Sequence, residues 1–94
     1  MSTMPEAPAD QQVAHLERLG QELRRRRLRV RLTDSLGRPP RLHIMNPEMS
    51  SLTEDVRVEL TVDGWWFVWS WAERICPAED VTDAADLVVR VLRV

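Results

Sequence analysis

The sequence predicts an α+β domain in the order α-β-β-β-β-α, a four-stranded antiparallel meander with both helices on one face of the sheet. Three observations predict it: apolar stripes at helical spacing near both ends of the chain, apolar–polar alternation between them, and an Asp-Gly dipeptide joining two alternating runs. The 94 residues, 44% of them apolar, suffice for one compact domain. We therefore expect residues 1–9 to be a disordered tail and residues 10–94 to form a single two-layer α+β domain.

The first helix is expected from Gln11 to about Arg26, with Asp10 as its N-cap. Its apolar side recurs at three- and four-residue spacing: Val13, Leu16, Leu19, Gly20 and Leu23. The run Arg24–Arg27 falls at the end of this helix. Arginines there complement the negative end of the helix dipole, which is a structural role.

Helical spacing then gives way to alternation. The first strand is expected where apolar residues point to one face and arginines to the other: Leu28, Val30 and Leu32 against Arg27, Arg29 and Arg31. A short second strand follows at residues 41–45. Asn46-Pro47 is expected to end it, because proline has no N–H donor. Residues 46–54 are then predicted to be a loop.

The segment 55–71 holds two alternating runs joined by Asp63-Gly64, a dipeptide that favours a two-residue type I′ hairpin turn. A turn at this place sets the register and puts eight apolar side chains on one face. The predicted pairs are Val62 with Trp65, Leu60 with Phe67, Val58 with Trp69, and Val56 with Trp71.

The second helix is expected from about Pro77 or Asp80 to Arg93. Acidic residues in its first turn suit the positive end of the helix dipole. Its apolar stripe is Val81, Ala84, Ala85, Val88, Val91 and Leu92. The two alanines would let this helix lie close to the bulky tryptophans of the sheet.

The charges divide along the chain. All 13 basic residues are arginines, and the net charge is −2. Residues 1–41 have a net charge of +4 and residues 42–94 a net charge of −6. The overall acidity argues against a dedicated duplex-DNA-binding domain. No apolar run is long enough to span a membrane, and a single cysteine with no basic and apolar N-terminal leader favours a cytoplasmic protein.

Few residues suggest catalysis. Cys76 precedes a helix start, where the dipole could lower the pKa of a thiol, and His43 could act as a general base. Each also has a plain structural interpretation, as a packed or a solvated side chain. The histidines and the cysteine lack the spacing of metal ligands, and no glycine-rich phosphate loop occurs. We expect no cofactor and no metal, and the sequence leans against an enzyme.

The sheet face away from the helices is the candidate binding surface. The residues expected there are Arg29, Arg31, Arg41, His43, Arg57, Trp66 and Val68. An exposed tryptophan commonly marks an interaction site. The leading hypothesis is a non-enzymatic accessory or regulatory module that acts through protein–protein contact on this face, as a homodimer. The alternatives are single-stranded nucleic-acid or small-ligand binding by the same arginines and tryptophan, and a small enzyme using His43 or Cys76.

The C-terminal half resembles a family of short uncharacterised actinobacterial proteins with an alternating-Trp strand. The matching residues are Asn46-Pro47, the run Trp65–Trp71, Ile75, Asp80, Ala84-Ala85 and Val91-Leu92. The resemblance covers about half of the chain, and the alternating tryptophans are its specific part. It implies a bacterial cytoplasmic protein and no particular activity.

Overall fold

The computed structural model describes residues 8–34 and 37–93. In chain order its elements are α1 (Pro8–Arg25), β1 (Arg29–Thr33), β2 (Arg41–Asn46), β3 (Met49–Thr61), β4 (Gly64–Trp69), β5 (Arg74–Pro77) and α2 (Val81–Leu92). The strands form one antiparallel sheet in the order β1-β2-β3-β4-β5. The α+β class and the antiparallel meander are confirmed, but the sheet has five strands instead of four. Residues 1–7 of the predicted tail lie outside the described residues.

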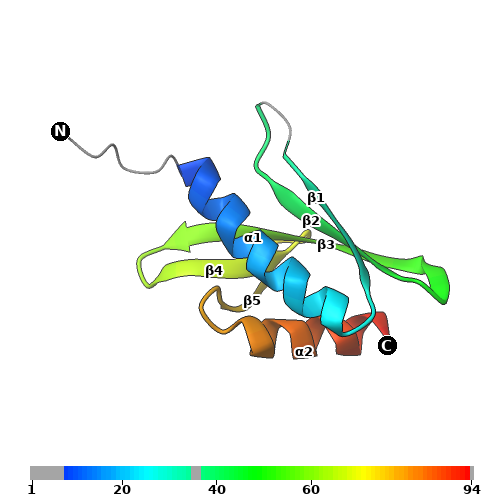
Figure 1. Ribbon diagram of the computed structural model, residues 1–94. Helices are drawn as coiled ribbons and strands as arrows, with labels where there is room; N and C mark the ends of the chain where they lie inside the picture. The colour runs from blue at the N-terminus through cyan, green and yellow to red at the C-terminus, as the bar shows by residue number, and fades with distance from the viewer. Residues whose placement is uncertain (1–7, 35–36, 94) are drawn as a thin grey trace.

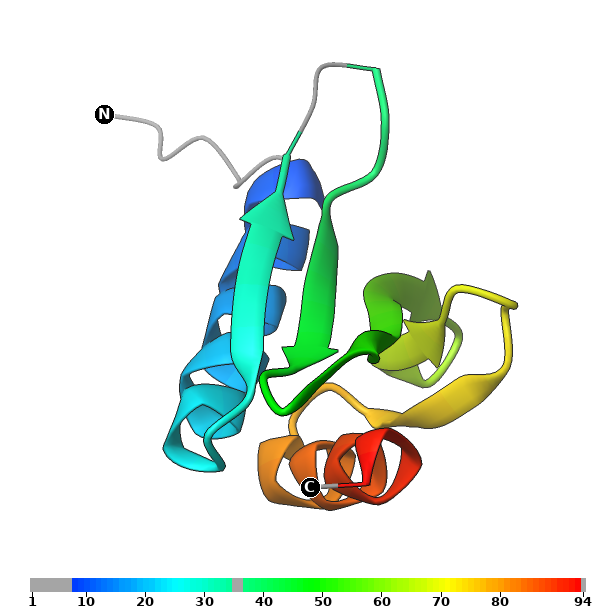
Figure 2. The same cartoon turned by 90° about the vertical axis from the view of Figure 1, so that its right-hand side faces the viewer.

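Both helices pack against one side of a strongly twisted sheet (Figures 1 and 2). α1 crosses β1, β2 and β3, whereas α2 lies against β5 and β3 and contacts α1. One apolar cluster joins the two helices to the even-numbered side chains of β2 and β3 and to Phe67 and Trp69 of β4. Its sheet residues are Leu42, Ile44, Val56, Val58, Phe67 and Trp69.

The end of α1 explains the run of four arginines. Arg27 has a φ of 66°, its N–H donates to the carbonyl of Arg24, and the N–H of Leu28 donates to the carbonyl of Leu23. This is the Schellman arrangement, with the apolar contact between Leu23 and Leu28 that accompanies it. Arg26 joins α1 to α2 through Asp86, at 2.6 Å. The last three arginines of the run therefore have structural roles at the end of α1.

The hairpin β3–β4 differs from the prediction by two residues. Thr61 pairs with Gly64, Leu60 with Trp65 and Val58 with Phe67, so Val62 and Asp63 form the turn. A type I′ turn needs positive φ at both central residues, and neither of these has it; Gly64 does, with a φ of 105°. That combination is typical of a type I turn followed by a glycine bulge. The predicted pairs are wrong. Val56, Val58, Phe67 and Trp69 are in the core as predicted, but Leu60 and Val62 are exposed.

Two other predictions about the strands are wrong. Residues 49–54 are not a loop but the first half of the long β3, and only Pro47 and Glu48 form the turn after β2. Trp71 is not in the core: it lies in the turn after β4, 51% exposed and stacked on Trp69 at 5.1 Å between ring centroids. The chain then returns as β5, which the sequence analysis did not predict.

Asn46 is the buried polar residue at the end of β2, with 4% of its surface exposed. Its Nδ2 donates to the carbonyl of Leu92, 2.9 Å away in the last turn of α2. Its Oδ1 accepts a hydrogen bond from the N–H of Glu48, also at 2.9 Å. The Asn-Pro dipeptide thus makes the turn after β2 and also binds one of the free carbonyls at the C-terminal end of a helix.

The N-terminal half of α1 is hydrogen-bonded to β3 and β4. Gln12 donates to the carbonyl of Val58, and Trp65 donates its indole N–H to Gln11. His15 packs against the Trp65 ring, at 5.7 Å between centroids. Burial and the nearby Arg18 lower the pKa of His15, and Arg18 donates to its Nδ1 at 2.6 Å. The neutral ring is therefore the form that this contact favours.

Gly20 offers a test of how α1 sits on the sheet. A Cβ at this position would lie 3.4 Å from a methyl group of Leu42 and 3.6 Å from one of Val30, which is ordinary contact. Since alanine is the better helix former, Gly20→Ala is expected to raise the free energy of unfolding by about 0.5–1 kcal/mol in urea denaturation. Gly64→Ala is the control, because its positive φ predicts a loss of about 1 kcal/mol. A loss at Gly20 would mean that α1 lies closer to the sheet.

Candidate functional site

The surface of interest is the sheet face opposite the helices, which we call the arginine face. It carries the odd-numbered side chains of β1, β2 and β3 and the even-numbered ones of β4, since successive side chains of a strand alternate. The registers place Arg31 opposite His43 and His43 opposite Asp55. In the next row, Thr33 lies opposite Arg41, and further along the sheet Arg57 lies opposite Val68. All seven candidate residues thus occupy this face, but they do not form one site.

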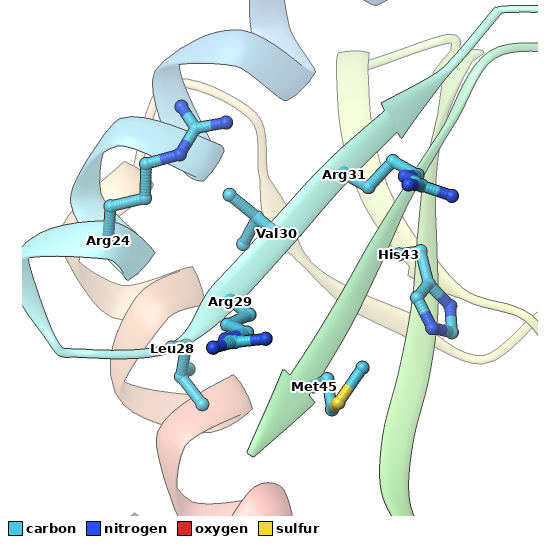
Figure 3. Close-up of a pocket in the computed structure, with 7 residues that line it drawn as sticks. All are labelled: Arg24, Leu28, Arg29, Val30, Arg31, His43 and Met45. Carbon is cyan, nitrogen blue, oxygen red and sulfur yellow. The ribbon is translucent and has the colours of Figure 1, made fainter. Parts of the chain in front are cut away.

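Arg29, Arg31 and His43 belong to one hollow, which we call the edge groove (Figure 3). Its volume is about 590 Å³, and its lining residues are Arg24, Leu28, Arg29, Val30, Arg31, His43 and Met45. Arg24 comes from α1, on the other side of the sheet. A hollow that touches both Arg24 and His43 has to pass around the free edge of β1. The groove therefore follows that edge and opens onto the arginine face.

Arg41 and Arg57 line a second, smaller hollow. Its volume is about 310 Å³, and its other lining residues are Arg38, Pro39, Asp55 and Ser70. Trp66 and Val68 line neither hollow. Only 1% of the Val68 surface is exposed, so its predicted place on an open surface is wrong. The reason is β5, which puts Arg74 beside Val68 on the side away from Arg57.

Trp66 is less accessible than expected. The guanidinium of Arg74 lies over its ring, 5.5 Å from the centroid, and the ring is half-buried. Its indole Nε1 is buried and, among the described residues, has no hydrogen-bond partner. The prediction of an exposed indole is therefore wrong. β5 covers Trp66 as it covers Val68, and it does so with a cation–π contact.

His43 and Asp55 form a hydrogen-bonded pair on the arginine face that was not predicted from the sequence. His43 Nδ1 lies 2.6 Å from Asp55 Oδ1, and both side chains are partly exposed. Asp55 orients the ring, but the described residues place no hydroxyl or thiol within hydrogen-bond distance of it. The pair thus resembles the base and orienting acid of a catalytic triad without a nucleophile.

The arginines differ in whether a carboxylate neutralises them. Arg57 approaches Glu59 at 4.0 Å, and Asp55 is occupied by His43. Within residues 8–34 and 37–93, no carboxylate lies within 4.0 Å of Arg29, Arg31 or Arg41. Arg29 and Arg31 are exposed. The groove end of the arginine face therefore has an excess of positive charge in an otherwise acidic chain.

Cys76 is not an activated nucleophile. It lies in β5, and its Sγ donates to the carbonyl of Asp80 at 3.5 Å. Burial, with Asp80 and Asp83 nearby, raises its pKa to about 11. The predicted effect of a helix start on the thiol is therefore outweighed. Among the described residues, no cluster of histidine, cysteine, aspartate or glutamate could hold a metal ion.

The raised pKa of Cys76 predicts slow alkylation. At pH 8 a thiol of pKa about 11 is ionised in about one molecule per thousand, against roughly a quarter for an ordinary cysteine. Iodoacetamide should therefore label the native protein on the order of a hundredfold more slowly than the urea-unfolded chain. Mass spectrometry of timed samples measures both rates. Equal rates would show that Cys76 is an ordinary exposed thiol.

Comparisons of the chain with known protein families, curated proteins and solved structures found no match. The resemblance to short actinobacterial proteins therefore stays a prediction. No helix among the described residues is both long and apolar enough to cross a membrane.

Proposed function

We propose that this chain is a non-enzymatic module that acts through protein–protein contact, and that the arginine face binds an acidic segment of another protein. One observation carries the proposal: Arg29, Arg31 and Arg41 share this face without a carboxylate within 4.0 Å in the described chain. Guanidinium groups bind carboxylates with two parallel hydrogen bonds, which gives both attraction and orientation. We place this activity in the cytoplasm, since the single cysteine is a free thiol.

The same charges argue against a homodimer through this face. In a two-fold dimer the same patch of both copies meets itself. The three unneutralised arginines of one copy would then approach those of the other, and like charges at an interface oppose association. The homodimer of the sequence hypothesis is therefore the weaker form of the protein-contact proposal.

The aromatic residues argue against single-stranded nucleic acid. Proteins of that class stack bases on exposed aromatic rings beside a positively charged groove. All five aromatic residues of this chain, counting Phe and Trp, lie between Trp65 and Trp71. Trp66 is the one on the arginine face, and Arg74 covers it. The face offers phosphate contacts without a stacking platform, which suits an acidic peptide better than exposed bases.

The proposal is tested with poly-L-glutamate as the probe. We expect binding that weakens as salt rises, measured by titration calorimetry. The double variant Arg29→Gln with Arg31→Gln should bind at least tenfold more weakly, because each lost charge-assisted contact is worth about 1 kcal/mol or more. Arg90→Gln is the control, since it removes an exposed arginine from α2, away from the arginine face.

Three results would contradict the proposal. One is the absence of binding at low salt, and the second is an equal loss of affinity in the Arg90→Gln control. The third is a salt-resistant dimer, detected by light scattering, that dissociates when Arg31 is replaced. Tighter binding of oligo-dT than of poly-L-glutamate, with quenching of tryptophan fluorescence, would favour the nucleic-acid alternative.

A further inference from the structure

We propose that the free edge of β1 accepts the acidic segment as an additional antiparallel strand of the sheet, with acidic side chains alternating along it. This inference rests on the proposed function and specifies how the partner binds. β1 ends the strand order, so the N–H and C=O groups of alternate residues point away from β2. Extended peptides bind such edges through main-chain hydrogen bonds, and their alternate side chains supply specificity.

The edge groove provides the space for this strand. Four consecutive residues, Leu28 to Arg31, line it together with Arg24 of α1 and His43 of β2. Arg29, Val30 and Arg31 are successive residues of β1 and point to alternate faces, so a hollow lined by all three lies along the strand edge. Figure 3 shows Val30 and Arg31 on opposite sides of the β1 ribbon, with Arg24 beyond the edge. A strand laid in the groove would therefore continue the sheet beside β1.

The two faces of β1 determine what sequence would fit. Arg29 and Arg31 are exposed on one face, while Val30 and Leu32 are partly buried against the core on the other. Cross-strand neighbours lie about 5 Å apart, and opposite charges in such pairs stabilise a sheet. The incoming strand would thus place acidic residues opposite the arginines and apolar residues next to Val30 and Leu32. It would be an alternating acidic–apolar segment.

A second copy of β1 is a poor occupant of this edge. When two β1 strands overlap fully in an antiparallel pair, Arg31 of one copy lies directly opposite Arg31 of the other. Like charges in that position are destabilising, and charged residues on edge strands are a common protection against self-pairing. The sequence of β1 therefore disfavours its own copy and favours an acidic strand.

The opposite edge of the sheet is unsuited to the same role. β5 has only four residues and ends at Pro77, which has no N–H to donate. The pairing of β4 with β5 shifts register between Phe67 and Val68. Irregularities of this kind bend and twist the edge of a sheet. Of the two edges, β1 is the regular one, and it is the one beside the positive charges.

The experiment uses a short peptide of alternating glutamate and valine, and the same peptide N-methylated on alternate residues. Amide hydrogen exchange of the whole protein is followed by NMR. When the peptide binds, the outward-facing amides of β1 should exchange at least tenfold more slowly, while those of β5 stay unchanged. N-methylation, which removes main-chain donors and keeps every charge, should weaken binding at least tenfold.

The outcomes separate this inference from the proposed function. If both peptides bind equally and β1 amides are not slowed, the acidic segment lies on the arginine face without pairing. The edge inference is then wrong, and the proposed function stands. If poly-L-glutamate and both peptides fail to bind, the proposed function is wrong as well. If the unmodified peptide protects β5 instead of β1, the edge has been misidentified.

Discussion

Phe67→Ala is expected to lower the free energy of unfolding by about 3–5 kcal/mol, the range found for large aromatic residues in protein cores. Phe67 has no exposed surface and lies in β4, paired with Val58 of β3 on one side and Cys76 of β5 on the other. Its removal leaves a cavity that the surrounding strands cannot close. Since small domains are only marginally stable, a loss of this size is a large fraction of the stability of the native state.

Trp71→Ala is the matched control for Phe67→Ala. Both residues belong to the same alternating run, and the sequence predicts both to be core. Trp71 is half-exposed, stacks on Trp69 and donates its indole N–H to Glu73 at 2.9 Å, so its removal should cost about 1 kcal/mol or less. Urea unfolding of the two variants measures the difference. Similar losses would place Trp71 in the core, as the sequence alone suggests.

Asn46→Asp is expected to destabilise the protein by about 3 kcal/mol or more. The substitution removes the donor that binds the carbonyl of Leu92 and puts a negative charge beside the C-terminal end of α2. A buried carboxylate facing a carbonyl is unfavourable both because it loses water and because the helix dipole is negative there. Asn46→Ala lacks the charge and should cost about 2–3 kcal/mol.

The pH dependence of stability should distinguish Asn46→Asp from Asn46→Ala. The site would raise the pKa of the introduced carboxyl above its unfolded value of about 3.9, because the neutral acid can donate to Leu92 as the amide does. The folded state would then bind protons more readily than the unfolded chain. The Asn46→Asp variant should therefore gain stability relative to Asn46→Ala as pH falls toward 4, and lose it as pH rises. A constant difference between pH 4 and 8 would show that the Asn46 side chain does not bind Leu92.

The sequence predicts the faces of the strands better than their register. Alternation with a period of two places Val56, Val58 and Phe67 on the core side, because a shift by two residues leaves the faces unchanged. The register depends on the turn, and the two turn residues, Val62 and Asp63, lack the positive φ that a type I′ turn needs. Val62 continues the apolar alternation but lies in the turn, fully exposed. The apolar alternation therefore predicts that Val62 is a strand residue, whereas it is a turn residue.

The part of the sheet that was missed lacks a clear pattern. Residues 49–54 contain neither alternation nor β-branched runs, and they become strand because β2 pairs with them. A register shift between Met45 and Asn46 then places Asp55 opposite His43, which no count from the Pro47-Glu48 turn would predict. β5 has four residues and ends at Pro77, so its sequence is typical of a loop. Because β5 was not predicted, Trp66 and Val68 were expected to be exposed.

The candidate site, too, could be predicted only in part from the sequence. Arg29, Arg31 and His43 could be assigned to one face from alternation alone, and the structure places them there. The contribution of Arg24 could not be predicted, because it depends on how α1 packs against β1. A long-range contact of this kind leaves no local signal in a single sequence.

The sequential order of the strands has a consequence for how the chain folds. Each of the five strands pairs with its neighbour in the sequence, so the sheet can grow one hairpin at a time with little loss of chain entropy at each step. The contacts that close long stretches of chain are those of the two helices: α1 binds β3 and β4 through Gln12 and Trp65, and α2 binds Arg26 and Asn46. We therefore expect docking of the helices onto the sheet to complete folding. Mutations in these helix contacts should then mainly accelerate unfolding and leave the folding rate nearly unchanged.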